Sequence, residues 1–258
     1  MLHTMCLITF AYQQHPKYKF ILLSNRDEFY RRPTLPATFW KDKPDILGGR
    51  DLLQSGTWLA VSKQGKFAAV TNFRDPSLPE AKKFSRGELP VHFLLQNNGN
   101  EAFLHQLSKN RHNYAGYNLL FGDKDSLYHY NNVYNQGIQI EAGIHGLSND
   151  TLNTPWPKVE RSKSGLANYL QSHTDLRTED LWPLLKDKTQ ADNHYLPQTG
   201  VDKDLEKALS SIFIDTPDYG TRASTILLID YDHNLTFVEK TYDKEDTLQQ
   251  YEFSLPSD

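Results

Sequence analysis

Cys6 is the only cysteine in the chain, and it begins a predicted strand that runs from Cys6 to Ala11. If the mature chain starts at Cys6, this residue carries both a thiol and a free α-amine. An α-amine has a reference pKa of about 7.7–8.0, close to the pH at which a general base works well. Cys6 would then combine a nucleophile and its base in one residue.

A polar stretch follows the next predicted strand, Tyr18–Leu23, and could serve such a nucleophile. Its sequence is Ser24-Asn25-Arg26-Asp27-Glu28-Phe29-Tyr30. Asp27 could hold the α-amine through a charge-assisted hydrogen bond. Arg26 could balance that carboxylate or lower the pKa of the thiol. This arrangement is the chemistry of an N-terminal nucleophile hydrolase.

Two asparagines are candidates for an oxyanion hole, because a neutral amide can donate to a developing negative charge. Asn72 ends the predicted strand Phe67–Asn72, and Asn149 follows Gly146-Leu147-Ser148.

Each of these residues also has a structural interpretation. A lone cysteine on a strand is more often a small buried hydrophobe than a nucleophile. Residues 25–28 could form a turn capped by their own side chains, and Asn72 and Asn149 could be turn residues. The residues alone leave both interpretations open.

Composition predicts a globular protein without a nucleic-acid partner. The chain has 258 residues, of which 38% are hydrophobic, and 28 basic residues stand against 32 acidic ones. The resulting net charge of −4 gives no electrostatic reason to expect nucleic acid or an anionic membrane. The absence of a predicted membrane span or signal peptide, together with a single cysteine that cannot form an internal disulfide, predicts a cytoplasmic protein without stable membrane insertion.

Short runs rich in branched and aromatic residues predict strands near both ends of the chain. Besides those named above they are Thr57–Ser62, Tyr117–Gly122, Ala223–Asp230 and Leu235–Thr241. Apolar spacing predicts helices in the middle, at Glu88–Gln96, Glu101–Lys109, Val159–Gln171 and Asp204–Phe213, and a capped helix start at Thr178. Lys186–Thr199 is polar and irregular, which indicates a surface loop. This order favours an α+β or layered architecture in one domain.

Several motifs together resemble one known family. They are Met5-Cys6-Leu7-Ile8, Ser24-Asn25-Arg26-Asp27-Glu28-Phe29-Tyr30, Gly56-Thr57-Trp58-Leu59, Thr71-Asn72, Arg86-Gly87-Glu88-Leu89, Gly116-Tyr117-Asn118-Leu119, Gly146-Leu147-Ser148-Asn149 and Tyr219-Gly220-Thr221-Arg222. The set resembles the NRDE family, whose eukaryotic members are called transport and Golgi organisation protein 2. The resemblance runs from Met5 to about Phe253 and implies a single NRDE-type domain over residues 1–258.

The resemblance implies an N-terminal nucleophile hydrolase-like fold. We therefore expect an α+β, four-layer αββα sandwich of two mostly antiparallel sheets. The family is distantly similar to the choloylglycine hydrolase group of cysteine amidases, which use an N-terminal Cys, an Asp, two Asn and a late Arg. By position these residues correspond to Cys6, Asp27, Asn72, Asn149 and Arg222, and this similarity adds Arg222 as a charge beside the thiol.

The local sequence departs from the hydrolase pattern at one point. The hydrolase group places an Arg before the Asn of Arg-Asn-x-Asp, whereas Ser24 holds that position here and Arg26 lies between Asn25 and Asp27. Neighbouring strand residues point to opposite faces, so Arg26 and Asp27 are not both expected in one pocket.

Residues 1–5 decide whether this chemistry is available. With Met1–Met5 in place, the nitrogen of Cys6 is acylated; we expect these residues to be removable or extra N-terminal residues.

The hydrolase hypothesis predicts cleavage of an amide or acyl bond in a small hydrophobic or amide-containing molecule, with no cofactor and no metal. The alternative implied by the family is a non-enzymatic carrier of haem, or of a lipid or acyl-coenzyme A, with haem as the carried ligand. A third hypothesis is a scaffold that keeps the fold without the chemistry.

Overall fold

The computed structural model describes residues 6–78, 82–243 and 245–256. The expected removal of residues 1–5 concerns residues outside these ranges. The described chain divides into two compact units, each assembled from separated segments. The first contains residues up to Arg31, 141–148 and 152–254, and the second contains residues 32–140, 149–151 and the chain after 254. The single-domain assignment stays a prediction.

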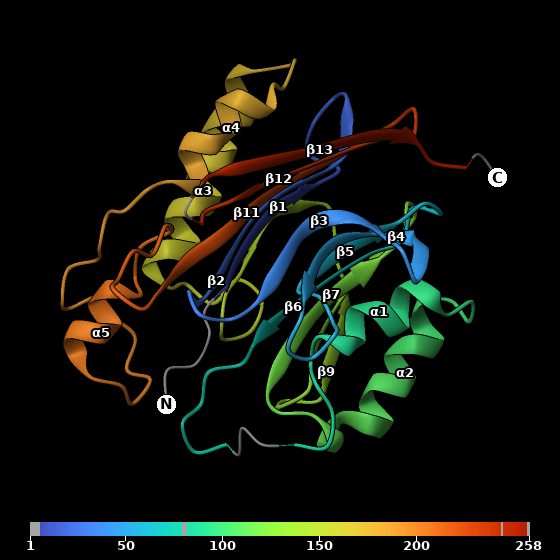
Figure 1. Cartoon of the computed structure of the whole chain (residues 1–258). Helices are drawn as coiled ribbons and strands as arrows, with labels where there is room; N and C mark the ends of the chain where they lie inside the picture. The colour runs from blue at the N-terminus through green and yellow to red at the C-terminus, as the bar shows by residue number, and fades with distance from the viewer. Residues whose placement is uncertain (1–5, 79–81, 244, 257–258) are drawn as a thin grey trace. The chain divides into compact units, whose positions relative to one another are not determined.

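The first unit is built on an antiparallel sheet that has six strands among the described residues, in the order β10-β1-β2-β11-β12-β13. The strands are β1 (Cys6–Tyr12), β2 (Tyr18–Phe29), β10 (Gly143–Leu147), β11 (Tyr219–Asp230), β12 (Asn234–Thr241) and β13 (Thr247–Ser254). The long strands β2 and β11 lie side by side in its centre, as Figure 1 shows.

Helices cover one face of this sheet. They are α3 (Pro157–Ser172) and α4 (Thr178–Leu185), with the short α5 (Lys203–Ala208) near one end. Pro157 stands at the first helical position of α3, where its missing N–H costs no hydrogen bond. Ile21 and Leu23 of β2 pack against Leu166 of α3 and Leu181 of α4. Odd-numbered residues of β2 therefore face the helices, and even-numbered ones face away.

The second unit is built on an antiparallel sheet with seven described strands in chain order, β3 to β9. They are β3 (Thr34–Trp40), β4 (Lys43–Asp51), β5 (Leu59–Ser62), β6 (Phe67–Asn72), β7 (Tyr117–Gly122), β8 (Leu127–Asn131) and β9 (Gln136–Gln139). Helices α1 (Glu88–Leu95) and α2 (Asn100–Asn110) and the single turn η1 (Arg111–Asn113) complete it. Phe93, Phe103 and Phe121 form an aromatic core between helices and sheet, with ring centroids 5.0–5.4 Å apart.

The α+β class with two antiparallel sheets is confirmed, and so are most predicted elements. Strands β5 and β6 pair as an antiparallel hairpin, and the loop predicted at 186–199 is present. The turn interpretation of residues 25–28 is wrong, because β2 continues through Phe29. The helix predicted over Asp204–Phe213 is also wrong in length, since α5 ends at Ala208. Helix α4 begins at Thr178, but the predicted cap is wrong, because the N-cap is Arg177 and makes no side-chain hydrogen bond to the helix; Pro183 lies inside this helix.

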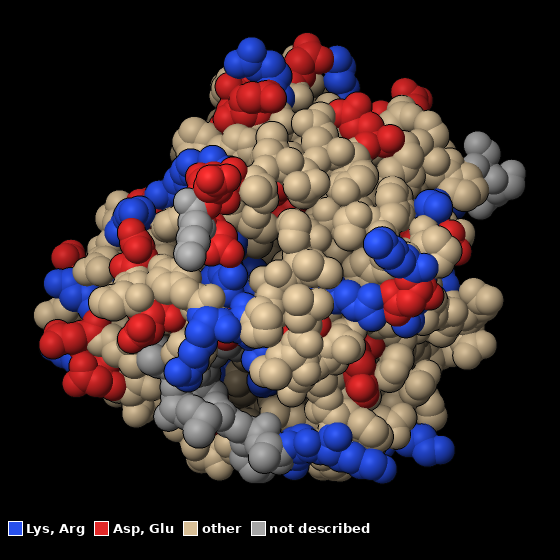
Figure 2. Space-filling model, viewed as in Figure 1, with Lys and Arg blue, Asp and Glu red and all other residues tan. Residues whose placement is uncertain are grey.

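Charged side chains of both signs are interspersed over the face drawn in Figure 2. Within the described ranges, none of the helices has the length and apolar character needed to cross a membrane.

The aromatic core of the second unit should dominate its stability. We expect Phe121→Ala to lower the free energy of unfolding by about 3–5 kcal/mol, because Phe121 is fully buried and its loss leaves a cavity. Urea denaturation measures this change. Leu53→Ala is the control, since Leu53 is 64% exposed and should change stability by under about 0.5 kcal/mol. A loss for Phe121→Ala no larger than that of the control would contradict the packing described.

Candidate active site around Cys6 and Asp27

Cys6 lies at the first position of β1, directly opposite Arg26 of β2. Cross-strand partners share a face of the sheet, so both side chains point away from the helices. Cys6 is half-buried, and its backbone carbonyl accepts a hydrogen bond from Oγ of Ser148 at 3.0 Å. The residue that follows β10 therefore helps to fix the backbone that carries the thiol.

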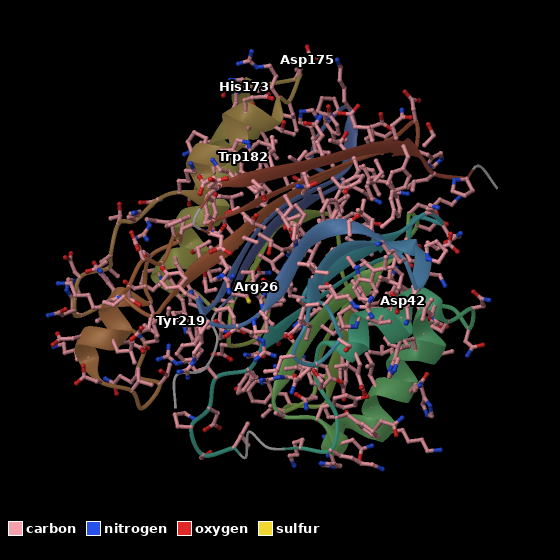
Figure 3. The ribbon with its side chains drawn as sticks, viewed as in Figure 1. Arg26, Asp42, His173, Asp175, Trp182 and Tyr219 are labelled. Carbon is pink, nitrogen blue, oxygen red and sulfur yellow. The ribbon has the colours of Figure 1, made fainter. Side chains whose placement is uncertain are left out.

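The polar stretch 24–28 alternates across β2. Asn25 faces the helices and donates from Nδ2 to the carbonyls of Leu185 and Ile212, each at 2.8 Å. Arg26 faces the other way, where its guanidinium lies 3.6 Å from the Glu28 carboxylate. Figure 3 shows Arg26 near the same end of the sheet as Tyr219, while His173 and Trp182 lie further up, on the helical layer.

Asp27 points to the helix-bearing face and is 1% exposed. Its Oδ1 accepts a hydrogen bond from Thr221 Oγ1 at 2.7 Å. Its Oδ2 is buried and receives no hydrogen bond from the described residues. Burial raises the pKa of Asp27 to about 7, although the positive charge of Lys158 and the Thr221 bond both oppose that rise.

A β-bulge at Arg222 allows the Thr221 hydroxyl to reach the Asp27 carboxylate. Thr221 pairs with Asp27 and Ala223 pairs with Arg26, so Arg222 is the extra residue on β11. Without this one-residue shift Thr221 would point to the face opposite Asp27. Arg222 itself donates from Nη1 to the carbonyl of Phe29 at 3.1 Å, and its Nη2 lies 3.9 Å from the Asp243 carboxylate.

The glycine before this bulge is required by close packing. A side chain at Gly220 would place a Cβ 2.6 Å from the carbonyl oxygen of Ile214 and 2.3 Å from the Tyr30 hydroxyl. Within the motif Tyr219-Gly220-Thr221-Arg222, Gly220 therefore allows close packing at the start of β11, and Arg222 forms the bulge.

The thiol of Cys6 is held in its neutral form. Burial and the Asp27 carboxylate raise its pKa to about 12, and the backbone N–H of Asp27 and the charge of Arg26 lower it by less. Arg26 therefore acts in the direction expected from the sequence but does not produce a thiolate. A base beside Cys6 is needed to activate it.

Asn72 and Asn149 come together in the second unit. Asn149 is fully buried, and its Nδ2 donates to the backbone carbonyl of Asn72 at 2.9 Å. The carbonyl of Asn149 accepts from the backbone N–H of Arg74 at 2.7 Å. Cys6, Arg26, Asp27 and Arg222 belong to the first unit. One site containing all six residues stays a prediction.

Two residues near Asp27 were not predicted from the sequence. Thr221 stood inside a recognised motif, but only the bulge brings it to Asp27. Lys158 gave no signal, because a lysine at the start of an amphipathic helix normally faces solvent. Over the described ranges, no group of three or more His, Cys, Asp or Glu side chains is arranged to hold a metal ion.

Comparison with known proteins identifies the family. A family model described as Transport and Golgi organisation 2 matches residues 5–244. The chain belongs to the Transport and Golgi organisation 2 family. It is 32% identical to the human Transport and Golgi organization protein 2 homolog, over 98% of this chain and 100% of that protein. It is 26% identical to Transport and Golgi organization protein 2 of Drosophila melanogaster, over 92% of each.

Among solved structures, one similar chain is a mutant of the conjugated bile acid hydrolase from Clostridium perfringens. It shares 8% identity with this member of the Transport and Golgi organisation 2 family, at a TM-score of 0.45, over 98% of this chain and 89% of that one.

The raised pKa of Asp27 predicts a pH-dependent stability. The unfolded carboxyl has the lower pKa, so between about pH 4 and pH 7 the unfolded chain loses a proton that the folded chain keeps. The contribution of Asp27 to the free energy of unfolding is therefore fully present below about pH 4 and is lost as the pH rises to about 7. We expect Asp27→Asn to gain stability relative to the wild type across this window, by up to about 1.4 kcal/mol per pH unit.

Urea denaturation at a series of pH values from 4 to 8 measures this difference. Asp45→Asn is the control, because the Asp45 side chain is 57% exposed on β4. A difference between Asp27→Asn and wild type that stays constant with pH would show that Asp27 titrates as an ordinary exposed carboxyl.

Proposed function

We propose that the protein is an N-terminal nucleophile cysteine hydrolase that cleaves an amide or acyl bond in a small molecule. The observation that carries this proposal is the position of Cys6. It begins β1, and its thiol lies against the backbone N–H and the charge of Asp27.

The neutral thiol supports a mechanism in which the α-amine of Cys6 is the base. In the 258-residue chain Met5 precedes Cys6, so the nitrogen of Cys6 is an amide and cannot accept a proton. A chain that begins at Cys6 has an amine at the same position. With a reference pKa of about 7.7–8.0, that amine is partly neutral at physiological pH and can take the thiol proton.

Asp27 is suited to hold this amine. Its buried Oδ2 accepts no hydrogen bond from the described residues, and a buried carboxylate oxygen without a donor is costly. An α-amine at Cys6 would supply a donor beside the residue whose backbone N–H already contacts the thiol. Thr221 holds the other oxygen and so fixes the carboxylate plane.

The reaction then has two balanced steps. The amine of Cys6 removes the thiol proton, Sγ attacks the carbonyl carbon, and the ammonium returns the proton to the leaving amine or alcohol, which leaves a thioester on Cys6. Water, deprotonated by the same amine, attacks the thioester, and the acid and the free thiol are released. The family resemblance assigns the oxyanion donors to Asn72 and Asn149 and a supporting charge to Arg222.

Acylation of the single thiol tests the proposal without knowledge of the substrate. We expect a chain beginning at Cys6, obtained by starting translation at Met5 and removing that methionine, to react with p-nitrophenyl acetate at Cys6. The matched control is the same chain with its methionine retained, which has the thiol but no free amine. General-base assistance predicts acylation at least about 100-fold faster in the chain with the free amine.

Intact mass spectrometry measures the acetyl group, and because the chain contains one cysteine, a thiol-linked group reports Cys6 alone. Cys6→Ala removes the thioester in both chains. Equal acylation rates with and without the free amine would contradict an N-terminal nucleophile mechanism.

A further inference from the structure

Lys158 is a buried lysine that no part of the sequence analysis assigned. It is 2% exposed and lies in the first turn of α3. Lysines are almost never fully buried unless a partner offsets the charge. The N-terminal end of a helix carries a partial positive charge, which further disfavours an ammonium there. A nearby negative charge would therefore stabilise Lys158.

The packing of α3 places its first turn over the part of the sheet that carries Asp27. Trp156, just before the helix, packs against the same buried cluster as Phe29 of β2, and it also packs against a second cluster that contains Leu7 of β1. Val159, next to Lys158, packs in that same cluster with Leu7. The start of α3 therefore covers the sheet where β1 begins and β2 ends. Asp27 precedes Phe29 by two residues and so points to this same helix-bearing face.

The electrostatics agree with this placement. Among the groups that lower the pKa of Asp27, the charge of Lys158 has the largest effect, ahead of the Thr221 hydrogen bond and the charge of Arg26. Other titratable or charged groups that influence this end of the sheet are Cys6 from β1, Glu28 from β2 and Tyr30 just after it. Arg222 of β11 donates to the carbonyl of Phe29 and lies near Asp243.

We propose that Lys158 is a positioning residue of the Cys6 site, whose buried ammonium favours the ionised form of Asp27, the form in which the carboxylate can hold the α-amine of Cys6. This inference rests on the proposed function. In this role Lys158 acts through Asp27 rather than directly on the thiol or a substrate.

Titration of Asp27 in the full-length chain tests the proposal independently of catalysis. Infrared spectroscopy follows the carboxylic-acid band that Asp27→Asn removes. We expect Lys158→Met to move the apparent pKa of Asp27 upward by ~1–3 units, the usual effect of losing a nearby opposite charge. Lys158→Arg should keep the wild-type titration. Lys163→Met, which removes a partly exposed lysine from the same helix, should leave it unchanged.

The proposal is overturned if folded Lys158→Met, checked by circular dichroism, titrates like the wild type. Lys158→Gln repeats the test with a polar neutral side chain. If neither neutral variant folds, Lys158→Arg decides, because a titration displaced despite the retained charge would exclude the electrostatic role.

Alkylation of Cys6 by iodoacetamide separates this inference from the proposed function. In the chain beginning at Cys6, we expect Lys158→Met to shift the pH profile of alkylation to higher pH and to slow the reaction at pH 7 by about tenfold, equivalent to one pKa unit. A profile that does not move would contradict the role of Lys158. If the wild-type chain beginning at Cys6 reacts no faster than the chain that retains its methionine, the proposed function fails, and the Asp27 titration still decides the role of Lys158.

Discussion

Burial of the Asp27 carboxylate is the constraint on which this end of the first unit depends. A carboxyl group removed from water must receive hydrogen bonds or opposite charge, or remain protonated. Thr221 supplies a hydrogen bond to one oxygen, and Lys158 supplies charge from the helical layer. The bulge at Arg222 gives Asp27 its Thr221 partner while the rest of β11 keeps its apolar face on the helices.

The same constraint explains why a buried strand ends in polar residues. β2 does not stop at Leu23 but carries Asn25 and Asp27 into the helix-bearing face, where each has a defined hydrogen-bond partner. Arg26 occupies the other face, opposite Cys6. Because side chains alternate along a strand, Arg26 lies on the same face of the sheet as Cys6, whereas the Asp27 carboxylate lies on the helix-bearing face. The thiol stays neutral in this environment, so the proposed mechanism needs a base, which a chain beginning at Cys6 would supply as its α-amine.

Much of this arrangement follows from the sequence, and the remainder depends on tertiary contacts. Alternating apolar runs predicted β1, β6, β7 and β12, and helical spacing predicted α1 to α3. The continuation of β2 was missed because Asn, Arg, Asp and Glu are typical of turns, and their burial is visible only once β11 and the helices cover them. β3 and β4 were missed for a similar reason, since Pro36, Pro44 and the pair Gly48-Gly49 weaken a strand pattern.

Among the candidate residues, Cys6 and Asp27 were proposed from residue type and position, whereas Asn72, Asn149 and Arg222 are assigned by the family resemblance. The role of Thr221 requires a one-residue bulge, which no local pattern predicts. The burial of Lys158 requires knowing which side of α3 packs over Asp27. Interactions that depend on strand register or on the rotation of a helix about its axis could therefore not be predicted from the sequence.

The central claim is that Cys6 acts with its own α-amine, and the N-terminus of the natural protein tests it most directly. Intact mass and N-terminal sequencing should be measured on untagged protein purified from its own host. The account predicts a chain whose first residue is Cys6. A chain that still carries residues before Cys6 would leave the thiol without its base and contradict the account.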